Sequence, residues 1–202
     1  MSVPRGTFGP LTVSREAAAA LARYADLVRR WSDGLNLVGP SDLDHFESRH
    51  IADCLRLLPL ARGLAPGPAI DVGSGAGLPG AVLAIAEPGR RWRLLEPQRR
   101  RAAFLEEVVR VLRLDAEVVV LSAEDAAVDA DLAGMHVLAT ARALATPATA
   151  FRIMEPLVAP CGVRAVMVGR GAEIPSEAEV WREGVAIIRG EELRQKGENG
   201  NS

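Results

Sequence analysis

The chain has 202 residues, of which 49% are hydrophobic and 25% charged, ordinary fractions for a folded globular domain. A single core of this size buries roughly 70% of the surface that the unfolded chain exposes, so no disulfide bond is needed to stabilise the fold. The 24 basic and 26 acidic residues nearly cancel, which excludes electrostatic attraction to nucleic acid along the whole chain.

The first part of the chain is predicted to be helical. Ser14 is a plausible N-cap, and Asp33-Gly34 is expected to end the helix. Four apolar residues share one face of it: Leu21, Ala25, Val28 and Trp31. A second helical stretch, with a break, is expected from about Ser41 to about Leu60. Because Pro66-Gly67-Pro68 is a hard boundary, residues 1–66 are predicted to form a helical cap.

After this boundary, short apolar runs alternate with helical segments, which is typical of an α/β domain with a mostly parallel sheet. The predicted strands are residues 69–72, 92–95, 117–121, 135–139, 163–168 and 185–188. Pro79, Pro97 and Pro147 each stand where the first turn of a helix accepts proline. We expect residues 67–190 to form this domain, and the polar residues 191–202 to be a disordered tail.

The clearest local signal is the run DVGSGAGLPG at residues 71–80, which follows the first strand and opens a helix. Glycines there let the backbone turn sharply and approach a ligand at the carboxyl end of the strand. Gly75, Gly77 and Gly80 formally satisfy the dinucleotide pattern G-x-G-x-x-G. Asp71, however, would repel a pyrophosphate and suits a cationic group such as the methionine part of S-adenosylmethionine. The sequence therefore favours a methyl donor, with a dinucleotide and a structural glycine turn as alternatives.

Two further acidic positions agree with a nucleoside cofactor. Glu96 ends the second strand, where its carboxylate can accept hydrogen bonds from ribose hydroxyls, or can interact with a helix dipole instead. Ser122-Ala123-Glu124-Asp125 follows the third strand, where an adenine edge would be read. A serine followed by acids also caps a helix, so this match alone is weak. The arginine cluster between residues 90 and 113 could bind phosphate or form a solvated helix surface.

Other sequence features predict a cytoplasmic protein without metal. Cys54 and Cys161 are too few for a disulfide scaffold and have no metal-ligand spacing. We expect no signal peptide, because the first ten residues have no apolar stretch. No membrane contact is expected either, because no run approaches the roughly 18 apolar residues of a spanning helix.

With these residues assembled, the chain resembles the bacterial small-subunit rRNA methyltransferase G family, also called glucose-inhibited division protein B. The resemblance covers about residues 24–170. The matching segments are Asn36-Leu37, Arg49-His50-Ile51 with Asp53, the loop at 71–80, LLEP at 94–97 with the arginines and Phe104-Leu105 that follow it, SAED at 122–125, and Thr140-Ala141-Arg142-Ala143.

The resemblance implies a Rossmann-like class I methyltransferase fold and S-adenosyl-L-methionine as cofactor. It also implies methylation of N7 of a guanine in 16S rRNA, with that rRNA or the small ribosomal subunit as partner, and we expect a monomer. It assigns donor contacts to Gly73, Leu78, Ala123 and Glu124. Arg142 would stand where donor and target base meet, and the helical cap would face the RNA.

Three groups of site residues follow from the local signals and the resemblance together. The expected cofactor site comprises Asp71, Gly73, Gly75, Gly77, Leu78, Glu96, Ala123, Glu124 and Arg142. The expected RNA contacts are Asn36, Arg49, His50, Arg142 and Arg170. Arg142 and His50 are the candidate catalytic residues.

The chemistry needs no general base, because guanine N7 has a free lone pair and no proton to lose. Catalysis would then depend on positioning and on electrostatics. Arg142 could donate to guanine O6 or to a phosphate, or be an ordinary surface arginine. His50 could stack on the base, bind phosphate or be structural. Its simplest expected partner is Asp53, three residues later on the same helical face.

The chain departs from the family near its end. Val168-Gly169 stands where the family has a Lys-Gly pair, with Arg170 just beyond. One closing strand, 185–188, is expected where the family has two. These departures leave open a divergent enzyme that methylates a small molecule, and an inactive rRNA or ribosome binder.

Overall fold

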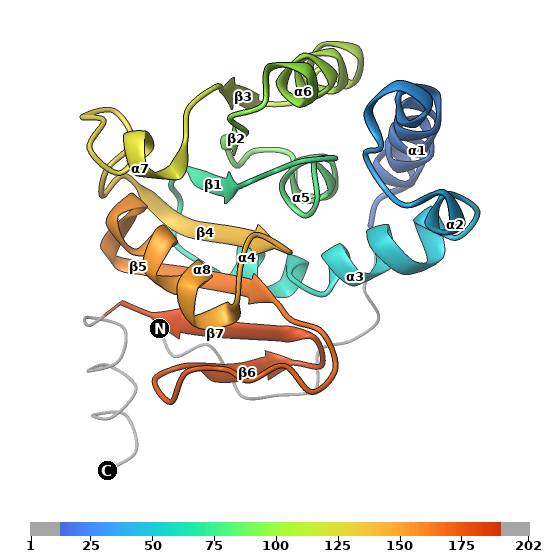
Figure 1. The fold of residues 1–202 in the computed structure, drawn as a ribbon. Coiled ribbons are helices and arrows are strands. Elements are labelled where there is room, and N and C mark those ends of the chain that lie inside the picture. Colours follow the sequence, from blue (N-terminus) through green and yellow to red (C-terminus); the bar gives the residue numbers. More distant parts are fainter. Residues whose placement is uncertain (1–12, 191–202) are drawn as a thin grey trace.

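The computed structural model describes residues 13–190, in which the strands form one sheet in the order β3-β2-β1-β4-β5-β7-β6 (Figure 1). The strands are β1 (Ala69–Val72), β2 (Trp92–Leu95), β3 (Ala116–Val119), β4 (His136–Arg142), β5 (Val158–Met167), β6 (Glu179–Arg182) and β7 (Val185–Arg189). The neighbours from β3 to β5 are parallel, whereas β7 is antiparallel to both β5 and β6. The predicted tail at 191–202 lies outside the described residues.

Helices cover both faces of the sheet, because alternate residues of the buried strands point to opposite sides. Ala69 packs with α4 (Leu58–Gly63) and α5 (Gly80–Ala86) on one face, where α6 (Arg99–Leu112) also lies. Ile70, the next residue, packs on the other face against α8 (Pro147–Met154). The short α7 (Ala123–Ala126) and the 3-10 turn η2 (Glu155–Leu157) lie on this second face too. The predicted α/β architecture is confirmed.

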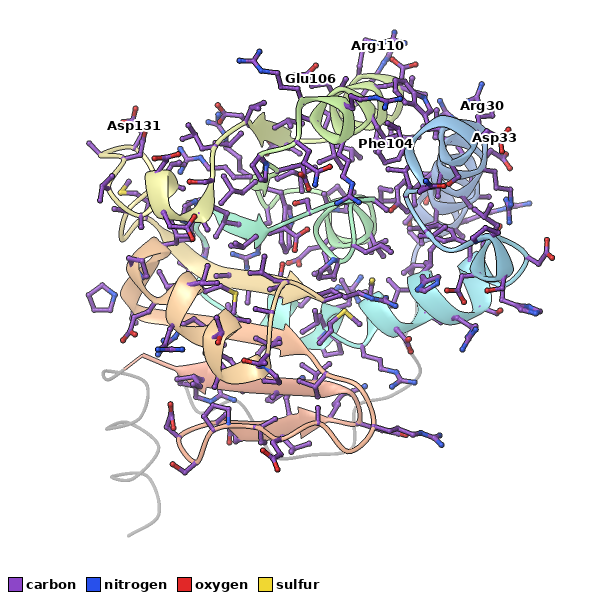
Figure 2. The ribbon with its side chains drawn as sticks, viewed as in Figure 1. Arg30, Asp33, Phe104, Glu106, Arg110 and Asp131 are labelled. Atoms are coloured by element: carbon purple, nitrogen blue, oxygen red, sulfur yellow. The ribbon has the colours of Figure 1, made fainter. Side chains whose placement is uncertain are left out.

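The N-terminal helix α1 (Arg15–Leu35) packs against α5 and α6, outside the first layer of helices (Figure 1). The Ser14 side chain accepts from Ala17 N at 3.1 Å, which confirms the predicted N-cap. The helix ends at Leu35, slightly later than predicted, and Asn36 caps it in the left-handed conformation. In Figure 2, Phe104 points from α6 toward α1, and its ring lies 5.8 Å from that of Trp31.

The second helical stretch is more fragmented than predicted. It consists of α2 (Pro40–Leu43), the π-helix η1 (Phe46–Ile51), α3 (Ala52–Leu55) and α4. Pro59 stands in the first turn of α4, where its missing N–H costs nothing but an earlier helix could not continue through it. These short pieces bring side chains of the cap to the end of β4.

Two predictions about element ends are wrong. Pro79 is the N-cap of α5, and Pro97 precedes Gln98, the N-cap of α6, so neither proline lies in a first helical turn. The chain also closes with two strands, β6 and β7, not one. β6 lacks an apolar run because it is an edge strand, and Val180 in it is 67% exposed. The closing hairpin of the expected family pattern is therefore present.

A buried arginine joins the cap to the sheet domain at the predicted boundary. Arg90 is 7% exposed. Its guanidinium donates to the carbonyls of Gly67 at 2.7 Å, Ala61 at 2.9 Å and Ala65 at 3.2 Å. These carbonyls belong to the end of α4 and to the linker before β1, so Arg90 fixes the path of the chain between the two regions.

Candidate cofactor and substrate site

The predicted site lies at the carboxyl ends of β1, β2 and β4. β1 is the middle strand of this group, paired in parallel with β2 on one side and β4 on the other. The chain leaves β1 to build β2 and β3, and then returns across β1 to build β4. Such a reversal leaves a crevice outside the strand ends, where open α/β sheets bind ligands.

The glycine loop fills this position, and its glycines serve two different purposes. Gly80 is required by packing, because a Cβ there would lie 2.5 Å from the Asp71 Cβ. A Cβ on Gly77 would lie 2.8 Å from the Ala81 Cβ. A Cβ on Gly75 would meet Gly73 O at 3.8 Å, which is an ordinary contact, although the φ of +54° favours glycine. A side chain on Gly75 would therefore meet no close neighbour, unlike one on Gly77 or Gly80.

Asp71 is fully buried at the end of β1 and is only partly satisfied. Its Oδ1 accepts from Thr140 Oγ1 at 2.7 Å, while its Oδ2 is buried without a hydrogen-bond partner. Burial raises the pKa of this carboxyl to about 6, against the opposing hydrogen bond from Thr140. A buried acceptor without a partner costs free energy, and an ammonium or other cationic donor could satisfy it.

Glu96 lies beside the same loop and is 3% exposed. Its Oε2 accepts from Gly75 N and its Oε1 from Gln98 N, both at 2.9 Å. Each carboxylate oxygen has two lone pairs, so both can accept a further hydrogen bond from a ligand hydroxyl. The Glu96 carboxylate thus connects the end of β2 directly to the glycine loop, 21 positions earlier in the chain.

The SAED segment forms the start of α7. Ser122 is the N-cap, and its Oγ accepts from Asp125 N at 3.0 Å, so the capping interpretation is confirmed. Ala123 is half-buried and Glu124 is exposed. The Glu124 side chain takes no part in this N-cap hydrogen bond and is exposed, whereas Ala123 packs in part against the core on this face of the sheet.

Arg142 and His50, which are 92 positions apart, meet at the end of β4. Arg142 Nη2 lies 2.5 Å from His50 Nδ1, and Arg142 Nη1 lies 3.8 Å from Cys54 Sγ. The predicted pairing of His50 with Asp53 is wrong, since Asp53 pairs with Arg56 at 3.3 Å. His50 Nε2 faces Asp42 Oδ2 at 3.7 Å instead. The π-helical turn of η1 places the His50 ring toward β4, which simple helical spacing does not anticipate.

Tyr24 connects the cap to the glycine loop. The Tyr24 hydroxyl is buried on α1 and donates to Ala76 O at 2.6 Å. Burial raises the Tyr24 pKa well above its usual value, so the hydroxyl keeps its proton and remains a donor. The loop is thus held from both sides, by Glu96 from the sheet and by Tyr24 from the cap.

Sequence reasoning missed four residues of this site as contributors: Tyr24, Asp42, Cys54 and Thr140. Thr140 and Tyr24 had some signal, since Thr140 is a buried polar residue next to Arg142 and Tyr24 is the single tyrosine, placed on the apolar stripe of α1. Asp42 and Cys54 had none, because their relation to Arg142 exists only in the folded chain.

The remaining predicted RNA contacts lie on the surface. Asn36 is exposed, and Arg49 pairs with Asp42 at 2.9 Å with its side chain 64% exposed. Arg170 is 97% exposed and lies 3.9 Å from Glu183. Arg56 donates to Glu183 O at 2.9 Å, which joins the cap to the turn between β6 and β7. The structure does not bring Asn36 or Arg170 into contact with Arg142.

Comparison with known proteins places the chain in a family. The model of the family described as rRNA small subunit methyltransferase G matches residues 17–197. The chain belongs to this family. The methyltransferase G of Acidiphilium cryptum is 41% identical over 198 residues, which are 91% of this chain and 88% of that protein. The methyltransferase G of Granulibacter bethesdensis is 44% identical over 161 residues, 80% of this chain and 72% of that protein.

The fold of this methyltransferase G family member agrees with a solved structure. A methyltransferase from Geobacter sulfurreducens superimposes with a TM-score of 0.56 at 15% identity, covering 93% of this chain and 91% of that one. The fold is the Rossmann-like fold of methyltransferases, with an N-terminal helical layer added.

Two kinds of feature are not found between residues 13 and 190 of this family member. No group of three or more histidine, cysteine, aspartate or glutamate side chains there could hold a metal ion. In the same part of the chain, no helix combines the length and the apolar character that crossing a membrane requires.

Proposed function

We propose that this protein transfers the methyl group of S-adenosyl-L-methionine to N7 of a guanine in 16S rRNA. The observation that carries the proposal is the buried, unpartnered Asp71 Oδ2 beside the glycine loop, in a chain of the methyltransferase G family. The proposal includes a cytoplasmic location, a monomer, and the division into a cap at 1–66 and a donor-binding domain at 67–190.

The residues present fit this cofactor. Asp71 offers a free carboxylate oxygen for the methionine ammonium, and Glu96 has lone pairs left for the ribose hydroxyls. Gly75 leaves the loop open to a close ligand. Gly73, Gly77 and Leu78 shape the rest of the loop, and Ala123 and Glu124 would border the adenine. When bound, S-adenosylmethionine supplies an electrophilic methyl group on a cationic sulfur.

The chain's own contribution to the reaction is to place and polarise the target base. Guanine N7 has a free lone pair, and the methylated product needs no deprotonation. Consistently, His50 Nδ1 is occupied by Arg142 and is not free to take a proton. Arg142 carries a fixed charge at the end of β4, where it would donate to guanine O6 or to an adjacent phosphate. Such a contact would hold N7 facing the methyl group.

The RNA contact would be limited to exposed residues of the cap and of the segment after β5. The formal net charge of −2 argues against a basic surface over the whole molecule. Arg49 is an exposed arginine of the cap and Arg170 an exposed arginine after β5, and Asn36 is exposed at the end of α1. Their long side chains can reach phosphates of a bound RNA segment.

The test is methyl transfer to purified small ribosomal subunits that lack the modification. Labelled donor should appear in 16S rRNA, and mass spectrometry of the digested nucleosides should identify 7-methylguanosine. Absence of transfer to rRNA at every assembly stage would reject the proposal. Donor binding by calorimetry without transfer would then indicate a small-molecule methyltransferase, and absence of donor binding would indicate an inactive rRNA binder.

A further inference from the structure

The contact between Arg142 and His50 fixes the protonation of the imidazole ring. A guanidinium group has N–H donors and no acceptor, and it stays charged at every physiological pH. His50 Nδ1, which faces Arg142 Nη2, must therefore accept, so it carries no proton. In a neutral ring the single proton is then on Nε2.

The surroundings of the other ring nitrogen favour the same state. His50 Nε2 is buried, has no hydrogen-bond partner, and faces Asp42 Oδ2 at 3.7 Å. This separation is too long for a hydrogen bond but short enough for a carboxylate to stabilise an N–H that points toward it. Asp42 Oδ1 accepts from Arg49 at 2.9 Å, which holds the carboxylate in place.

We propose that His50 and Asp42 are positioning residues for Arg142. His50 fixes the guanidinium through Nδ1, and Asp42 fixes the His50 tautomer. The Cys54 sulfur, 3.8 Å from Nη1, contacts the other arm of the guanidinium. With both arms held, the plane of the group is set and its remaining N–H donors point in a fixed direction.

This inference rests on the proposed function, in which Arg142 contacts the target guanine or its phosphate. It assigns His50 a different task from a general base or a base-stacking residue. It also explains why an aspartate of the short α2 matters to a residue at the end of β4. Because the flanking cap elements are short and partly π-helical, we expect the geometry of this group to depend on these polar contacts.

The first experiment uses no substrate. The chain has three histidines, so two-dimensional 15N–1H spectra that report ring-nitrogen shifts can be assigned by substituting His45 and His136 in turn. At pH 7.5 the His50 signals should show a protonated Nε2 and an unprotonated Nδ1. A protonated Nδ1 in the neutral ring would overturn the proposal, whatever the enzyme methylates.

The second experiment uses a matched pair of substitutions. His50→Asn keeps an amide oxygen near the position of Nδ1, whereas His50→Gln moves the amide to the position of Nε2 and leaves Arg142 without its acceptor. We expect turnover at saturating donor to stay within about 3-fold in His50→Asn and to fall about 100-fold in His50→Gln, since small misplacements of a reacting group cost about this much. Both variants should bind the donor as wild type does.

The third readout is the pH profile. The charged groups around the ring are Arg142 from β4, Asp42 from α2, Arg49 from η1 and Asp53 from α3. Protonation of Nδ1 would place two donors face to face, so wild-type turnover should fall on acidification. Burial and the charge of Arg142 lower the pKa of His50, so this decline should begin at a lower pH than for an ordinary imidazole. His50→Asn should lack this decline, because an amide does not titrate. A decline of equal size in both proteins would contradict the proposal.

Glu47→Gln serves as control, since Glu47 lies on the same π-helix and pairs with Arg29 at 2.6 Å, away from Arg142. It should leave turnover and the pH profile unchanged. If the wild-type protein does not methylate rRNA, the proposed function is rejected, but the tautomer result still holds. An active wild type with equal turnover in His50→Asn and His50→Gln would reject the positioning role alone.

Discussion

Thr140 and Asp71, on adjacent strands β4 and β1, share a buried hydrogen bond of 2.7 Å that orients one oxygen of the carboxylate and leaves the other free. The Thr140 hydroxyl can donate one proton, and it donates to Oδ1. The second oxygen is buried and has no hydrogen-bond partner among the described residues. This buried carboxyl affects the stability of the fold and, in the proposed function, the binding of the donor.

Asp71→Asn should remove a pH-dependent cost of folding. The folded-state pKa of about 6 is above the ordinary aspartate value of 3.8, so the folded protein binds this proton more tightly than the unfolded chain. The carboxyl therefore destabilises the fold progressively as pH rises from about 4 to about 6. The difference in unfolding free energy between the wild type and Asp71→Asn (wild type minus variant) should fall by roughly 2–3 kcal/mol as pH rises over this range.

Urea denaturation at pH 4 to 7.5 measures this difference. Asp131→Asn, a substitution of an exposed aspartate (Figure 2), should change the unfolding free energy by less than about 0.5 kcal/mol at every pH. A difference between wild type and Asp71→Asn that is independent of pH would contradict the burial argument. In the same buffers, wild-type donor affinity should rise through pH 6, and Asp71→Asn should bind weakly throughout.

Gly75→Asp should abolish donor binding while leaving the protein folded. A side chain there would enter the space proposed for the donor, and its charge would lie near Glu96, which accepts from Gly75 N. We expect an affinity loss of at least about 100-fold, equivalent to roughly 3 kcal/mol. The left-handed φ of +54° adds a folding cost of only about 1 kcal/mol.

Gly134→Asp provides the matched control for this change. Gly134 has a φ of +69°, and a Cβ there would meet no other atom within 4 Å. The residue lies just before the amino end of β4, whereas the glycine loop lies at the carboxyl end of β1. The two variants should therefore show similar melting temperatures but very different donor affinities by calorimetry. Equal donor affinity in the two variants would show that the loop does not hold the cofactor.

Arg142→Ala should reduce turnover much more than donor affinity. The guanidinium is held by His50 and Cys54 and is proposed to act on the target base, so its loss should cost about 100-fold in turnover. Donor dissociation constants should stay within a few-fold of wild type. Single-turnover kinetics measures the rate of methyl transfer, and calorimetry measures the donor dissociation constant. Arg152→Ala, on the exposed face of α8, is the control. Near-wild-type values for both quantities would remove Arg142 from the proposed site.

Arg90→Met should destabilise the fold without acting on the site directly. The substitution keeps an aliphatic side chain but leaves the carbonyls of Ala61, Ala65 and Gly67 without their buried donor, at a cost of about 3 kcal/mol. Arg91→Met, next in sequence, removes an exposed pair with Glu117 and should cost less than about 1 kcal/mol. Denaturation midpoints compare the two, and equal losses would contradict the structural role of Arg90.

The sequence predicted well where one local pattern is enough. The strand before the glycine loop is a short apolar run, and Ser14 caps α1 through its own side chain, so both could be recognised without knowing the fold. β6 was missed because an exposed edge strand has no apolar run. The His50–Asp53 pairing failed because a π-helical turn changes which side chains share a face.

The amino-acid sequence by itself determined the α/β class, the glycine loop and the acids at the ends of β1 and β2, because glycine content, apolar runs and strand ends are local properties. Tertiary structure alone decided how Asp71 divides its oxygens and which ring nitrogen of His50 faces Arg142. Those relations join residues 69 and 92 positions apart, and burial then sets their protonation through desolvation, which no sequence window contains.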